Sequence, residues 1–197
     1  FILASCLTFV FGFILKQDIQ KLIPHLFLGL IFWNFIYQTV SDGCTVFTGN
    51  AHFLQQINIP YLVLVFRVLI RNLFILAHNF LIIPIVFLFF NLDFNAHILL
   101  LIPNFLLTIS ILFFMIIILG IFNARFRDVE STIQNLMNVA FYLTPIFWNI
   151  SMVNNYKFYS LLNLNPFFHI IELLRTPFMG GITDNNLHYI FLISFLF

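Results

Sequence analysis

The sequence has 197 residues, of which 62% are hydrophobic and only 8% are charged. A water-soluble domain carries about 25% charged residues because its surface faces water, so these proportions exclude an ordinary soluble protein. The net charge of +1 gives no indication of a nucleic-acid partner. Two cysteines, Cys6 and Cys44, offer neither a metal-binding spacing nor a disulfide framework.

Long apolar runs separated by short polar segments predict an all-α membrane protein with six transmembrane helices. A helix needs about 20 apolar residues to cross a bilayer, and runs such as 109–119 lack the alternation of a barrel strand. The first and last segments are too short to span, so both are expected to be truncated. We expect residues 1–197 to form one membrane domain. The predicted segments are 1–15, 22–47, 59–90, 97–122, 133–148 and 187–197.

The third segment contains polar side chains that are unexpected in lipid. Arg67, Arg71 and His78 fall on one stripe of a helix that turns about 100° per residue. The length of the segment lets both arginines lie at the level of the lipid headgroups, whereas His78 and Asn79 fall at membrane depth. Two interpretations stay open for His78 and Asn79: they bond to a neighbouring helix, or they line a conduit.

Two later regions are also informative. Residues 123–132 are the most charged part of the chain, and the position of Arg125 and Arg127 beside two membrane segments favours the cytoplasmic side. Residues 149–186 contain apolar pieces that are too short to span, which predicts short re-entrant or interfacial helices before the last segment. Glu172 and Arg175 are three residues apart there and are expected to pair on a helix.

Several motifs occur together, in the order and spacing of one protein family. The chain resembles the permease subunits of type-2 ABC exporters, in the branch that exports polysaccharides such as O-antigen, capsule and teichoic acid. The resemblance covers nearly the whole chain. The motifs are Gly29-Leu30-Ile31-Phe32-Trp33-Asn34-Phe35, Arg71-Asn72 with Ala77-His78-Asn79, Arg125-Phe126-Arg127-Asp128, Tyr142-Leu143-Thr144-Pro145-Ile146-Phe147-Trp148, Leu164-Asn165-Pro166-Phe167 and Ile171-Glu172-Leu173-Leu174-Arg175.

The resemblance implies a multi-pass permease that exports lipid-linked polysaccharide across the bacterial inner (plasma) membrane. In that family the chain forms a homodimer with two copies of an ABC ATPase subunit, which binds ATP and Mg²⁺. We therefore expect no enzymatic activity, no cofactor and no metal on this chain. Its expected partners are the ATPase, a second copy of itself, the lipid-linked polysaccharide and membrane lipid. The family's N-terminal amphipathic helix and C-terminal end are expected to be missing.

The resemblance also implies roles for particular residues. In the loop after the second segment the family often carries basic residues, where this chain has His52, Gln55 and Gln56. Residues expected to couple to the ATPase are His52, Gln55, Gln56, Arg125, Arg127 and Asp128. Residues expected to line the translocation path are Trp33, Tyr37, His78, Asn79, Tyr142, Phe147 and Trp148. Residues expected at the outer gate are Asn165, Pro166, Glu172 and Arg175.

Aromatic side chains suit a path for sugars because ring faces stack on sugar C–H groups without requiring a deep binding site. The alternative is that these tryptophans and tyrosines mark the membrane interface. The alternative functions are an ABC permease for a drug or small lipid and, less favoured, a membrane-embedded glycan-modifying enzyme. The scattered histidines form no metal-binding motif, which disfavours the enzyme.

Overall fold

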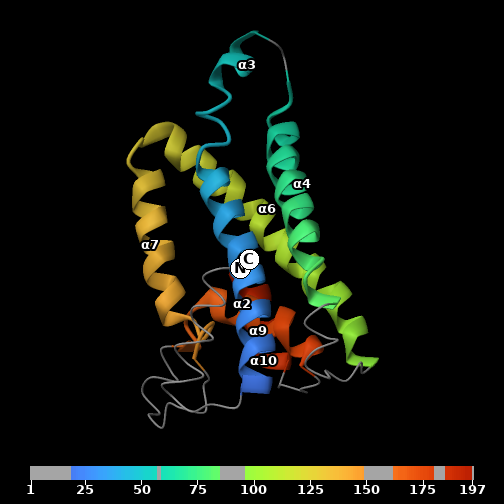
Figure 1. The fold of residues 1–197 in the computed structure, drawn as a ribbon. Coiled ribbons are helices and arrows are strands. Elements are labelled where there is room, and N and C mark those ends of the chain that lie inside the picture. Colours follow the sequence, from blue (N-terminus) through green and yellow to red (C-terminus); the bar gives the residue numbers. More distant parts are fainter. Residues whose placement is uncertain (1–18, 57–58, 85–95, 149–161, 180–184, 197) are drawn as a thin grey trace.

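The computed structural model describes residues 19–56, 59–84, 96–148, 162–179 and 185–196 (Figure 1). Within these ranges every regular element is a helix, so the predicted all-α fold class is confirmed. The predicted first segment, residues 1–15, lies outside the described residues, as do residues 85–90 of the third.

Three of the described helices are long and apolar enough to cross a membrane. They are α2 (Ile19–Cys44), α4 (Tyr61–Phe80) and α6 (Leu101–Arg125), the last of which follows the 3-10 helix η1 (Ala96–Leu100). They correspond to the second, third and fourth predicted segments, although α2 begins before residue 22 and α6 continues past residue 122. The count of six spans stays a prediction.

Helix α4 ends at Phe80, inside the predicted third segment, residues 59–90. The next two amides bond three residues back, Leu81 to His78 and Ile82 to Asn79, and helical backbone resumes at residues 83 and 84. Pro84 contributes to the break, because it has no N–H to offer the carbonyl of Phe80 and its ring crowds that carbonyl. Residues 85–90 lie outside the described residues.

Helix α2 is the central element, and it packs along α6 and α4 (Figure 1). Phe32 and Ile36 on α2 are completely buried, as are Leu112 and Ile116 on α6. Glycine permits the closest approach. A Cβ on Gly43 would lie 2.9 Å from the side chain of Ile116, and one on Gly120 would lie 2.6 Å from that of Val46. Larger residues at these two positions would force α2 and α6 apart.

Helix α7 (Val129–Leu143) packs against α2 and is joined to α6 by a short turn. The predicted fifth segment, residues 133–148, is therefore corrected at both ends. The polar loop predicted at 123–132 is also shorter, because α6 continues through Arg125 and α7 begins at Val129. At the other end, Thr144 is extended because it precedes Pro145, and this stops the helix.

The two ends of the bundle differ. One end carries α3 (Ala51–Gln56) and the α6–α7 turn, and the other carries α9 (Pro166–Arg175), η3 (Thr176–Phe178) and α10 (Asn185–Leu196) (Figure 1). We call these the α3 end and the α9 end. Helix α9 has only ten residues and lies where a short helix was predicted. Its re-entrant placement stays a prediction.

Candidate functional site

A cavity of about 420 Å³ opens between α2, α4 and α7, and we call it the central cleft. Four of the seven predicted path residues line it: Trp33, Tyr37, Asn79 and Tyr142. The packing of α2, α4 and α7 thus brings together residues that are far apart in the sequence. The remaining lining residues are Phe27, Leu30, Ile31, Asn34, Asn138 and Phe141.

Aromatic rings continue from the central cleft toward the α9 end. Trp33 is buried, and its ring centroid lies 5.6 Å from that of Phe141 and 5.8 Å from that of Phe167 on α9. Phe147 follows, 6.1 Å from Tyr142. Such edge and tilted contacts favour a fixed arrangement of the rings. The indole N–H of Trp148 also donates to the backbone carbonyl of Tyr142 over 3.4 Å.

Three carboxamides face the central cleft, one from each of its helices. Asn34 and Asn138 are exposed and Asn79 is half-buried. None of the three side chains has a hydrogen-bond partner among the described residues, although each offers two donors and an acceptor. Polar groups without partners are costly against lipid. The lining of the cleft is therefore suited to contact with water, protein or a polar ligand.

Sequence reasoning singled out Asn79 but did not name Asn34 and Asn138, which also line the cleft. A signal was present, because Asn34 lies between Trp33 and Phe35 and Asn138 lies between Met137 and Val139. His78, unlike Asn79, does not line the cleft. Its side chain is exposed on α4.

A polar cluster lies on α2 and α4 between the central cleft and the α3 end. Asp42 forms an ion pair with Arg71 and accepts a hydrogen bond of 3.0 Å from Nδ2 of Asn72. Asn72 is almost completely buried. Arg67, one turn earlier on α4, donates to Oδ1 of Asn50 over 3.4 Å. The arginines that were predicted to lie at the headgroups therefore also bind residues from outside their own helix.

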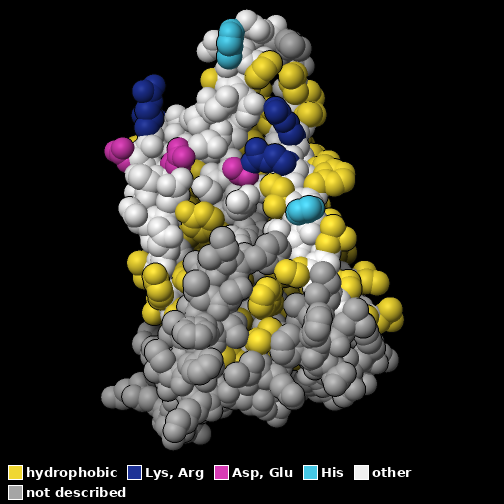
Figure 2. All heavy atoms as spheres, in the orientation of Figure 1, with side chains coloured by type: hydrophobic (Ala, Val, Ile, Leu, Met, Phe, Trp, Pro, Cys, Tyr) yellow, Lys and Arg dark blue, Asp and Glu magenta, His cyan; other side chains and the backbone are white. Residues whose placement is uncertain are grey.

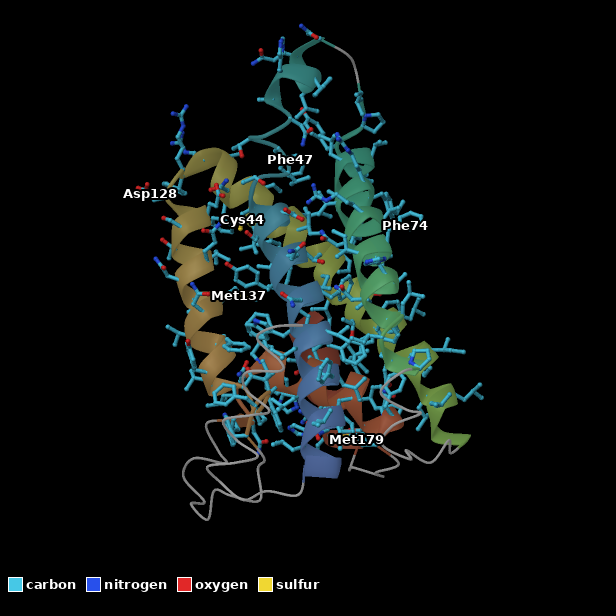
Figure 3. The ribbon with its side chains drawn as sticks, in the orientation of Figure 1. Cys44, Phe47, Phe74, Asp128, Met137 and Met179 are labelled. Atoms are coloured by element: carbon cyan, nitrogen blue, oxygen red, sulfur yellow. The ribbon has the colours of Figure 1, made fainter. Side chains whose placement is uncertain are left out.

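The residues predicted to contact an ATPase all lie at the α3 end, and all six are exposed: His52, Gln55, Gln56, Arg125, Arg127 and Asp128. Figure 2 shows that the acidic and basic side chains visible on this face gather toward the same end. Phe47 and Asp128, both labelled in Figure 3, lie in this region. The structure thus places two loops that are far apart in sequence at one end of the bundle.

Asn123 connects these two loops, and sequence reasoning gave it no role. Its side chain is buried at the end of α6. Its Oδ1 accepts from the backbone N–H of Glu130 at 3.1 Å, and its Nδ2 donates to Oγ1 of Thr48 at 3.5 Å. One amide therefore contacts both the first turn of α7 and the segment that leads into α3.

The predicted outer-gate residues lie at the α9 end. Asn165 caps α9 by accepting from the backbone N–H of Phe167 at 3.0 Å, and Pro166 occupies the first turn, where its missing N–H costs nothing. Arg175 ends the helix and pairs with Glu172, which confirms the pairing expected from their spacing. Arg175 is buried and also donates to Nε2 of His25 at 2.8 Å.

A search of the described residues finds no group of three or more histidine, cysteine, aspartate or glutamate side chains that could hold a metal ion.

Long apolar helices with a polar, aromatic cleft among them define an integral membrane protein of the α-helical class. The sequence matches the ABC-2 type transporter family over residues 1–179, and the chain belongs to this family.

Three curated relatives are each described as an O-antigen export system permease protein RfbA. The one from Myxococcus xanthus is 24% identical over 174 residues, which cover 86% of this chain and 65% of the relative. Two from Klebsiella pneumoniae are 25% and 26% identical, covering 95% and 89% of this chain and 71% and 68% of the relatives. The chain thus spans slightly less than two thirds of the length of the Myxococcus xanthus protein.

Proposed function

We propose that this chain is the membrane permease of an ABC transporter that exports lipid-linked polysaccharide. The central cleft is the observation that carries the proposal. It combines the rings of Trp33 and Tyr142 with three amide side chains that have no hydrogen-bond partner among the described residues. A polysaccharide presents hydroxyl groups and apolar C–H faces together, and this lining offers a partner for both. The names of the three relatives support the same cargo class.

The protein works as a homodimer with two copies of an ATPase subunit that binds ATP and Mg²⁺, and the chain itself is not an enzyme. It crosses the bacterial inner membrane six times. The α3 end lies on the cytoplasmic side, where α3 and the α6–α7 turn contact the ATPase. The arginines Arg125 and Arg127 in and beside that turn support this orientation.

A movement of the α3 end is transmitted to the central cleft by α2 and α7. Helix α2 leads directly into the segment before α3, and α7 starts at the turn beside it. Both helices line the cleft. Closing of the ATPase dimer therefore changes the width of the cleft, while α9 and the aromatic rings near it form the outer gate.

The test is polysaccharide export in the native host after deletion of the gene and complementation with variants. Tyr142→Ala and Trp148→Ala should reduce surface polysaccharide and leave the homodimer and its ATPase complex assembled. A matched control is Phe74→Ala, since Phe74 is 71% exposed on α4 and points away from the bundle (Figure 3). Normal export by both the Tyr142 and the Trp148 variant would remove these residues from the path. If the variants lose efflux of a small amphipathic compound but still export polysaccharide, the result would favour a drug or lipid permease.

A further inference from the structure

We propose that the central cleft selects an uncharged glycan over an acidic one. This inference rests on the proposed function and narrows its substrate class. Among the residues that the structure describes, all the side chains that line the cleft are uncharged. The polar ones are the amides Asn34, Asn79 and Asn138 and the hydroxyls Tyr37 and Tyr142, and the others are apolar.

The free hydrogen-bonding groups of the cleft match sugar hydroxyls. Each carboxamide has donors and an acceptor, and each hydroxyl of a neutral sugar both donates and accepts. A carboxylate or phosphodiester on an acidic glycan only accepts. Such a group would leave the amide oxygens of Asn34, Asn79 and Asn138 without donors. It would also give up hydration without gaining a cation in return.

The aromatic rings of the cleft also favour an uncharged glycan over an acidic one. The face of an aromatic ring carries the negative part of its quadrupole, so it attracts C–H groups and repels an anion. Five aromatic side chains line the cleft: Phe27, Trp33, Tyr37, Phe141 and Tyr142. A sugar ring can stack on these surfaces as a neutral residue, whereas an anionic substituent held against them is disfavoured.

The charged groups nearest the cleft along α2 do not offer an acidic glycan a free positive charge. Asp42 lies five residues beyond Tyr37, about 7.5 Å along the helix axis. It is an acid, and its partner Arg71 is already engaged in the ion pair. A glycan that enters from the α3 end therefore meets a neutralised pair before it reaches a cleft whose described lining residues include no cation.

The test is saturation-transfer NMR on the permease–ATPase complex in lipid nanodiscs, which detects weak carbohydrate binding. The probes are neutral maltohexaose and a hexamer of galacturonic acid, so that length is matched and charge differs. We expect maltohexaose to bind at least about tenfold more tightly. The variants Asn138→Lys and Asn34→Lys should each reverse or abolish this preference, and Asn138→Gln should keep it.

The outcomes separate the two proposals. Equal or tighter binding of the acidic hexamer overturns the selection for uncharged glycans and leaves the export function standing. An unchanged preference in both lysine variants places binding outside the central cleft and also overturns the inference. If neither hexamer binds, the proposed role of the cleft as a glycan path fails.

Discussion

The guanidinium of Arg175 donates a hydrogen bond to the backbone carbonyl of Pro145, 3.0 Å away and thirty residues earlier in the chain. At the other end of α9, Nδ2 of Asn165 donates to Oγ1 of Thr144 at 2.9 Å. Both ends of the short helix are thus attached to two consecutive residues that follow α7. Asn104 of α6 holds the same helix from another side, since its Nδ2 donates to the carbonyl of Leu173 at 2.6 Å.

Replacing Arg175 with Met should destabilise the protein. The substitution leaves Glu172 and the carbonyl of Pro145 without their partner in a buried environment, and breaking a buried ion pair by removing one side costs about 3–5 kcal/mol. Thermal unfolding of the purified protein in detergent measures the effect. The same change at exposed Arg127 is the control and should leave the melting temperature unchanged. Equal stability of the two variants would show that Arg175 does not anchor α9.

Replacing Asn123 with Ala should uncouple ATP hydrolysis from export. The amide of Asn123 contacts both Thr48 and Glu130, so its loss lets the segment before α3 and the start of α7 move independently. We expect several-fold less polysaccharide exported per ATP hydrolysed, with the ATPase complex still assembled. Asn135→Ala, on an exposed position of α7, is the matched control. A normal ratio of export to hydrolysis in the Asn123 variant would contradict this role.

Two exposed phenylalanines at the α3 end should anchor the ATPase. Phe53 of α3 is 54% exposed and Phe126 of the α6–α7 turn is 59% exposed. Aromatic side chains at the centre of an interface often contribute more than 1 kcal/mol each, so each Ala variant should weaken association by roughly tenfold. Affinity is measured by titrating the ATPase against permease in nanodiscs. Phe74→Ala, on the side of α4, should bind normally, and a normal affinity of both α3-end variants would exclude these anchors.

The sequence predicted element types well because the apolar runs are long and the helical period is strong. It also predicted the Glu172–Arg175 pair, since residues three apart on one helix are neighbours regardless of the rest of the fold. The ends of helices were less predictable. Pro145 follows the observed stop of α7, and Pro84 follows a break after α4, but a proline in a membrane helix is compatible with either a kink or an end.

Contacts between helices could not be predicted from one sequence. The ion pair of Arg71 with Asp42 joins α4 to α2, and periodicity shows which face a residue occupies but not which helix lies opposite. The same limit explains why Asn34 and Asn138 were missed. They lie on two different helices, and their relation appears only when α2 and α7 lie side by side.

The central claim is that the cleft between α2, α4 and α7 carries the glycan during export. Photocrosslinking tests it most directly. A benzophenone amino acid replaces Tyr142 in one variant and Phe74 in another, since both are strongly exposed aromatic residues on different faces of the bundle. During ATP-driven export of radiolabelled lipid-linked polysaccharide, the label should attach to the protein at position 142 and not at position 74. Labelling at position 74 with none at position 142 would contradict the account.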